Sequence, residues 1–256
     1  EKPRFDAKNL RTEMFRFAAA STLAGATAYG VYQYTKPKKE IPKIIISGGP
    51  GSGKGTQCEN IVEKYGVKHI STGDALRHHV KTGTELGKEA KGYMDRGDLV
   101  PDDLVIGICR AEMETPEAKK NGWLLDGMPR TKAQCEALDA MKLVPNLFLL
   151  LDVPDEVMME RACGRRQDPV TRKIYHVKYK PAPSEEIAKR LIIRSDDTVE
   201  KMTNRIKQYH KNFEAVSGFY KDKLVTVDGN RAPKAVFPEV AAAIDDAVLV
   251  KPGAKK

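Results

Sequence analysis

The sequence has few of the residues that build disulfide frameworks or metal centres. Its 256 residues include four cysteines, five histidines and one tryptophan. Cys58, Cys109, Cys135 and Cys163 lie 51, 26 and 28 residues apart, which matches neither a disulfide framework nor the paired ligands of a structural zinc site. We therefore expect four reduced thiols, partly buried.

The sequence also lacks internal repeats, low-complexity tracts and a basic stripe interleaved with aromatic residues. These absences exclude a repeat architecture and a dedicated nucleic-acid surface. The net charge of +9 lies mostly at the ends, because residues 1–43 carry nine Lys/Arg against four Asp/Glu and the basic tail 251–256 adds three Lys. This leaves about +1 on the body, whose length and composition suit one main α/β domain over residues 41–250.

The N-terminal extension, residues 1–40, has no strongly apolar run, but residues 17–35 are uncharged. Ala20, Ala24 and Ala28 repeat at the spacing that lets membrane helices pack closely. Residues 15–35 are thus a candidate membrane helix, which would anchor the chain in a membrane or pack against a membrane-protein partner. A soluble docking helix and the remnant of an organellar targeting segment are the alternatives. We expect an organellar, membrane-associated protein, with the mitochondrial inner membrane favoured and the chloroplast as the alternative.

A glycine-rich loop, residues 48–56, follows the apolar run Ile44–Ile46 and precedes a helix-like segment. This order predicts a strand, a phosphate-binding loop and a helix, in which backbone N–H groups and a lysine surround phosphate oxygens. A glycine turn that binds nothing is the alternative. The residues expected to bind a nucleoside triphosphate here are Gly51, Ser52, Gly53, Lys54, Gly55 and Thr56.

Apolar runs alternate with helix-period segments along the body, which predicts a doubly wound, five-stranded parallel sheet covered by helices. The strand candidates are residues 43–47, 69–71, 123–126, 147–153 and 224–227. One polar, proline-containing segment, about residues 165–196, interrupts this alternation. We interpret it as an inserted lid, with a flexible surface loop as the alternative.

Charged residues suited to phosphoryl transfer follow two of the predicted strands. Asp126 ends a strand, where it can order the water ligands of magnesium, and Arg130 lies a turn further on, where it can bind a phosphate. Four more arginines form two pairs, each sharing one side of a helix: Arg161, Arg165, Arg194 and Arg205. They can converge on one anionic centre, or they can be ordinary solvated surface charges.

Residues 43–248 resemble the long-lid adenylate kinases, with a lid close to the plant organellar type. The resemblance rests on the phosphate loop, on Ser71-Thr72-Gly73-Asp74, on the loop 97–102 and on the segment 126–130. It implies a P-loop fold with an AMP-binding arm inserted at about residues 72–101 and the lid at about 165–196. The implied reaction is transfer of phosphate from MgATP to AMP, giving two ADP.

The resemblance also implies roles for individual residues. Those around the transferring phosphate would be Lys54, Asp126, Arg130, Arg161, Arg165, Arg194 and Arg205. Those that bind ATP, beyond the phosphate loop, would be Arg161, Arg165, Ile174, Tyr175 and Arg231. Those that bind AMP would be Thr72, Arg77, Asp98, Leu99, Val100, Gly127, Met128, Pro129, Arg130, Gln134, Arg194 and Arg205.

The expected ligands are ATP, AMP and ADP, and the expected cofactor is Mg²⁺, which arrives with ATP and has no direct protein ligand. The lid has no cysteine set, so zinc is not expected there. Arg172 stands where the lid turn of the family usually has Gly. We expect a monomeric catalytic domain. A kinase with another donor such as GTP, and a nucleotide-binding structural subunit of a membrane complex, are the alternative functions.

Overall fold

Three consecutive isoleucines form the centre of the strand β1 (Lys43–Ser47), and each is at most 1% exposed, so both faces of this strand are covered. In the computed structural model, which describes residues 40–248, β1 pairs in parallel with β3 and with β4. The complete sheet has the order β2-β3-β1-β4-β7, and all of its pairings are parallel. The other strands are β2 (Lys68–Ser71), β3 (Trp123–Asp126), β4 (Leu147–Asp152) and β7 (Leu224–Asp228).

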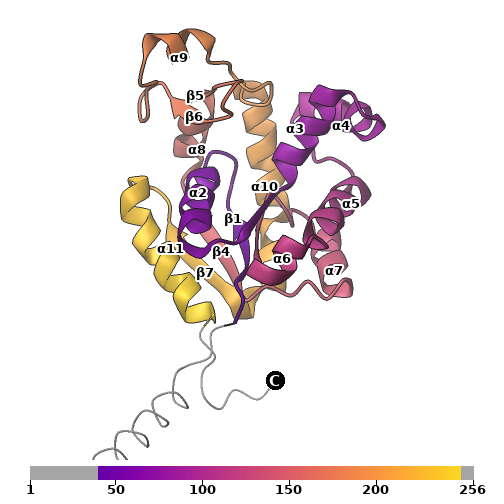
Figure 1. Cartoon of the computed structure of the whole chain (residues 1–256). Helices are drawn as coiled ribbons and strands as arrows, with labels where there is room; N and C mark the ends of the chain where they lie inside the picture. Colours follow the sequence, from indigo (N-terminus) through magenta and orange to yellow (C-terminus); the bar gives the residue numbers. More distant parts are fainter. Residues whose placement is uncertain (1–39, 249–256) are drawn as a thin grey trace, which may run out of the picture. The chain divides into compact units, whose positions relative to one another are not determined.

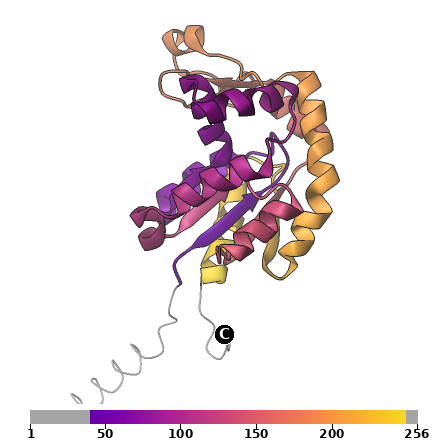
Figure 2. The ribbon, with the colours of Figure 1, turned by 90° about the vertical axis from the view of Figure 1, so that its right-hand side faces the viewer.

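The five predicted strands are therefore confirmed, each within one residue at either end. Helices cover both faces of the sheet (Figures 1 and 2). Ile44 and Ile46 pack with residues of α2 (Lys54–Tyr65) and α11 (Pro233–Val248). Ile45 points to the opposite face, because side chains alternate along a strand, and packs with residues of α5, α7 and α10. These are α5 (Asp102–Met113), α7 (Lys132–Ala140) and α10 (Val199–Phe219).

Serine or threonine residues cap the N-termini of several other helices. Ser71, Thr84, Thr115, Ser184 and Thr198 each accept a hydrogen bond from a backbone N–H in the first helical turn. They open α3 (Thr72–Thr82), α4 (Glu85–Arg96), α6 (Pro116–Asn121), α9 (Glu185–Arg190) and α10. The helix α2 begins after Gly53 with no side-chain cap, and α5 and α8 (Asp155–Cys163) likewise begin after a proline without one. The first N–H groups of α2 thus donate to no capping side chain.

Two excursions leave the sheet at its carboxyl end (Figure 1). The first, α3 and α4, fills most of the range 72–101. The second follows α8 (Asp155–Cys163) and holds the antiparallel strands β5 (Arg165–Gln167) and β6 (Ile174–His176) and then α9. Arg172, in the turn between β5 and β6, has φ 60, so this turn places a non-glycine residue in the left-handed region, where glycine is usually favoured.

No helix within residues 40–248 is long and apolar enough to span a membrane. The candidate membrane helix, residues 15–35, lies outside the described residues, as does the basic tail 251–256. A 3-10 turn (Lys221–Lys223) connects α10 to β7 and completes the described elements.

Candidate active site

One cleft of about 1360 Å³ lies at the carboxyl edge of the sheet. It is large for a single small ligand, since drug-sized pockets are usually about 300–1,000 Å³. Every residue that the sequence analysis assigned to ATP, AMP or the transferring phosphate lines it. The arginine pairs, which could have been separate surface charges, therefore share one cavity.

The phosphate loop forms one wall of this cleft. Gly51 has φ 87, and a Cβ added there would lie 2.3 Å from the carbonyl oxygen of Met158, so only glycine fits. Gly53, with φ 95, leads directly into α2, whose first N–H groups can donate hydrogen bonds to an anion. Lys54 Nζ donates to the carbonyl oxygens of Gly48 (2.6 Å) and Gly49 (2.8 Å).

Lys54 and Asp126 form the charged floor of the site. Burial, together with the charge of Arg130 and despite the attraction of Asp126, lowers the pKa of Lys54 to about 8. Burial acts to raise the pKa of Asp126, but the nearby His69, Lys54 and Arg130 outweigh it and lower that pKa overall. Asp126 is thus ionised at neutral pH and can interact with a hydrated cation.

Two buried acids hold the arginines in position, and neither was predicted. Asp197 accepts hydrogen bonds from Arg165 Nε (2.8 Å) and Nη2 (2.5 Å), while its Oδ1 lies 3.6 Å from Arg205 Nη1. Asp196 Oδ2 lies 3.1 Å from the same Arg205 atom and 3.9 Å from Arg77 Nη1. The only sequence signal was two adjacent acids at the end of an arginine-rich segment.

The cations remain in excess in spite of these acids. Burial and the charges of Arg77 and Arg165 lower the pKa of Arg194 to about 10. Burial also lowers the pKa of Arg205, with Asp196 opposing the shift. Mutual repulsion among buried cations is relieved by an anionic ligand, so the middle of the cleft is suited to phosphate groups.

At one end of the cleft, Arg161 of α8 meets the loop after the last strand. Arg161 Nη1 donates to the carbonyl oxygen of Gly229 (2.9 Å), and Tyr175 is buried on β6. Arg231 forms two hydrogen bonds with Glu239, at 2.7 and 2.8 Å. Ile174 also lines the cleft here. This end offers an apolar surface and backbone groups rather than further free charge.

The other end is formed by α3, the loop after α4 and the segment after β3. Gln134 is 2% exposed; its side-chain oxygen accepts from the N–H of Arg130 (2.7 Å) and its amide nitrogen donates to Asp102 (2.8 Å). One amide hydrogen of Gln134 therefore remains for a ligand. Asp98 pairs with Arg96 (2.8 Å) and accepts from Asn204 (2.9 Å), so its carboxylate is occupied, and its N–H donates to the carbonyl oxygen of Tyr93 (2.9 Å).

The remaining predicted residues at this end are small or apolar. Thr72, Val100 and Met128 are buried, and the Met128–Pro129 peptide bond is cis. The fold and the site together define a nucleotide phosphotransferase of the P-loop class, with a phosphate loop and room for two nucleotides in one cleft.

Comparisons with known proteins identify the family. A family model described as adenylate kinase matches residues 46–225. The chloroplastic adenylate kinase of Zea mays is 50% identical over 198 residues, which cover 77% of this chain and 89% of that protein. A probable chloroplastic adenylate kinase of Oryza sativa is 49% identical over 203 residues, covering 79% of this chain and 70% of that protein. The adenylate kinase of Gloeobacter violaceus is 40% identical over 212 residues, covering 77% and 96%.

The chain belongs to the adenylate kinase family. It is an enzyme that transfers a phosphoryl group between ATP and AMP and forms two molecules of ADP.

Proposed function

We propose that the cleft binds MgATP with its triphosphate on the loop 48–56 and its base between Tyr175 and Arg231, and that AMP binds at the opposite end beside Gln134. The observation that carries this assignment is the cleft itself. It joins an uncapped helix N-terminus and two less charged ends through a centre rich in cations. Two nucleotides bound in this way direct their phosphates toward each other, as in-line transfer requires.

The proposed roles follow from position and charge. Lys54 leaves the carbonyl oxygens of the loop and binds the terminal phosphates of ATP. Arg77 binds the phosphate of AMP, with Thr72 near its ribose and base. The transferring group is surrounded by Arg130, Arg161, Arg165, Arg194 and Arg205, which neutralise the charge on its oxygens. No general base is needed, because an oxygen of the AMP phosphate is already anionic at neutral pH.

Magnesium would enter as part of MgATP. Hard oxygen donors suit this ion, and the ionised carboxylate of Asp126 meets that requirement at the edge of the phosphate loop. Asp126 would hold water ligands of the ion rather than the ion itself. When bound, the ion would supply positive charge against the phosphate oxygens.

We infer that the lid, residues 165–196, and the AMP-binding arm, residues 72–101, close over the two nucleotides. Closure removes water from the cleft, so that the phosphoryl group passes to AMP rather than to solvent. Arg165 and Arg194 lie within the lid range and line the cleft, which supports a lid that supplies charge when it closes.

The experiment is to replace Lys54 with Met and Arg130 with Ala and to measure ADP formed from MgATP and AMP. Each change should lower kcat by orders of magnitude while the far-UV circular dichroism stays that of the wild type. Lys132→Met is the matched control, because Lys132 is exposed on α7 outside the cleft. Near-normal turnover in Lys54→Met would remove Lys54 from the transition state.

Donor choice is tested separately. We propose ATP rather than GTP as the donor, on the family resemblance. A panel of ATP, GTP, CTP and UTP, each with AMP, should give the highest kcat/KM with ATP. Equal or faster transfer from GTP would replace the proposed donor.

We infer a plastid location, supported by the chloroplastic relatives in maize and rice. These relatives favour the chloroplast over the mitochondrion preferred from the sequence. Membrane attachment through residues 15–35 stays a prediction, to be tested on source organelles by extraction with alkaline carbonate. Chain and activity retained together in the pellet would support an anchored enzyme, and release of both would make residues 1–40 a docking or targeting segment.

A further inference from the structure

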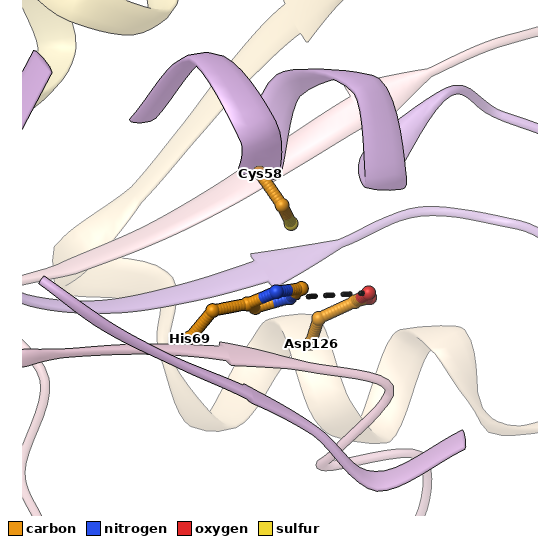
Figure 3. A group of neighbouring side chains, drawn as sticks. All are labelled: Cys58, His69 and Asp126. Atoms are coloured by element: carbon orange, nitrogen blue, oxygen red, sulfur yellow. Dashed lines mark ion pairs between the residues drawn. The ribbon is translucent and has the colours of Figure 1, made fainter. Parts of the chain in front are cut away.

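Three side chains with metal-binding atoms, from α2, β2 and β3, meet in one group (Figure 3). Cys58 lies on α2, one turn after Lys54. His69 lies on β2 and Asp126 ends β3; because Ser71 pairs with Asp126 in register, His69 and Asp126 point to the same face of the sheet. The helix α2 covers that face, so its Cys58 completes the group.

The geometry of the group suits a small cation. One ligand atom from each residue lies within 4.8 Å of the other two. A tetrahedral zinc ion holds its nitrogen, oxygen and sulfur ligands at about 2.0–2.3 Å, so the ligands lie about 3.3–3.8 Å apart. Contraction by about 1 Å, within reach of side-chain rotation, would therefore close the site.

Two of the ligand atoms make no hydrogen bond among the described residues. His69 Nε2 is buried and makes no hydrogen bond among the described residues, and the nearest carboxylate oxygen, Asp126 Oδ2, is 3.8 Å away. Cys58 is fully buried and is a free thiol. A buried polar atom with no partner is costly, and a metal ion bound to it removes that cost.

We propose that Cys58, His69 and Asp126 bind Zn²⁺, and that the bound ion inhibits phosphoryl transfer. The imidazole and thiolate select zinc over magnesium, which prefers oxygen donors. On binding, the Cys58 thiol passes its proton to solvent and becomes the thiolate ligand, while an imidazole nitrogen of His69 and the ionised carboxylate of Asp126 bind directly. His69 and Asp126 line the cleft, so the fourth position of the ion is open to it.

The inhibition rests on the role proposed above for Asp126. A carboxylate bound to zinc can no longer hold the water ligands of the magnesium ion that accompanies ATP. The added positive charge also lies close to Lys54. Zinc bound at this site should therefore lower kcat. Whether zinc binds there does not depend on the catalytic role proposed for Asp126.

The binding test uses Cd²⁺, whose bond to a thiolate gives a charge-transfer absorption band. The full chain should develop this band and reach saturation at one equivalent. Cys58→Ala should abolish the band, and His69→Asn should weaken binding by about 100-fold or more, beyond the 10–100-fold typical of a lost outer partner. Cys163→Ala is the matched control, because Cys163 is the more exposed thiol, and it should keep the band.

The absence of a band in the wild type, or a band that persists in Cys58→Ala, would overturn the site. The inhibition test adds Zn²⁺ to the assay in excess MgATP and reverses it with a zinc-selective chelator. Inhibition should be lost in Cys58→Ala, whose activity without zinc stays near that of the wild type. Equal inhibition of the wild type and Cys58→Ala would mean that zinc acts through the nucleotide, and it would overturn the inhibitory role of the site. Failure of AMP-dependent turnover in every protein, with or without zinc, would instead refute the proposed catalytic assignment.

Discussion

Replacing Asp197 with Asn tests whether a residue outside the predicted site controls the catalytic arginines. The Asp197 side chain is fully buried, and it holds Arg165 through two charge-assisted hydrogen bonds. Asparagine keeps the size of the side chain but removes its charge. One of its two acceptors becomes an N–H donor that faces the N–H groups of Arg165. The guanidinium of Arg165 would then lose its fixed direction toward the centre of the cleft.

The expected magnitude follows from these contacts. A hydrogen bond to a charged group contributes about 1.5–3 kcal/mol, and breaking a buried ion pair costs about 3–5 kcal/mol. The Arg165 side chain is 20% exposed, so water replaces part of the lost interaction and we expect about 2–3 kcal/mol. If this loss falls on the transition state, kcat decreases by about 30- to 150-fold.

The assay is steady-state ADP formation with saturating MgATP and varied AMP, together with urea unfolding. A positioning role predicts that kcat falls more than the KM for AMP rises, because Arg165 acts on the transferring group. Asp222→Asn is the matched control, since Asp222 is an exposed acid outside the cleft. If Asp197→Asn keeps kcat within about twofold while unfolding at a lower urea concentration, Asp197 stabilises the fold and does not position Arg165.

Three further predictions follow from single residues. The pKa of Lys54 is lowered to about 8 and its charged form binds phosphate, so kcat/KM for ATP should fall above about pH 8. Bound phosphates favour the charged form, so kcat should fall only at higher pH. If kcat and kcat/KM fell at the same pH, this reasoning would be contradicted. Asp168→Asn removes the buried acceptor of Arg190 (2.7 and 2.9 Å) and should raise the KM for ATP by loosening the lid, with an unchanged KM as the contrary result. Lys142→Gly should raise the free energy of unfolding, measured in urea, by about 0.5–1 kcal/mol. The backbone strain at φ 57 is relieved, and this gain exceeds the cost of the entropy that glycine adds to the unfolded chain. A lower free energy of unfolding would show that Lys142 is not strained.

The sheet could be predicted because its signals are local. Buried parallel strands consist of short apolar runs, and the run Ile44–Ile46 followed by glycines fixes both β1 and the phosphate loop. Polar residues at strand ends, such as Asp126, could be assigned to the cleft because the carboxyl ends of parallel strands share one edge. The arginines came from the resemblance, since spacing alone could not separate converging charges from solvated ones.

What could not be predicted depends on contacts between distant segments. Asp197 meets Arg165 across 32 residues, through a chain path that no periodicity describes. In the same way, the distances along the chain between the cysteines gave no sign of a metal site. Cys58 meets His69 and Asp126 only through the packing of α2 on β2 and β3. Sequence spacing detects ligand sets within one loop or helix, whereas this group takes one residue from each of three elements.

The partners of the cations suggest how the cleft changes on binding. Lys54, Arg130 and Arg161 donate to neutral backbone carbonyl oxygens, of Gly48 and Gly49, of Gly127 and of Gly229 respectively. Arg165 is held instead by a buried carboxylate, and Arg205 lies beside two. A phosphate oxygen is a stronger acceptor for a cation than a carbonyl oxygen is, so the first group should exchange its partners when nucleotide binds. The second group should keep its carboxylates and receive the phosphates in a fixed direction, which supplies preorganised charge for the transfer.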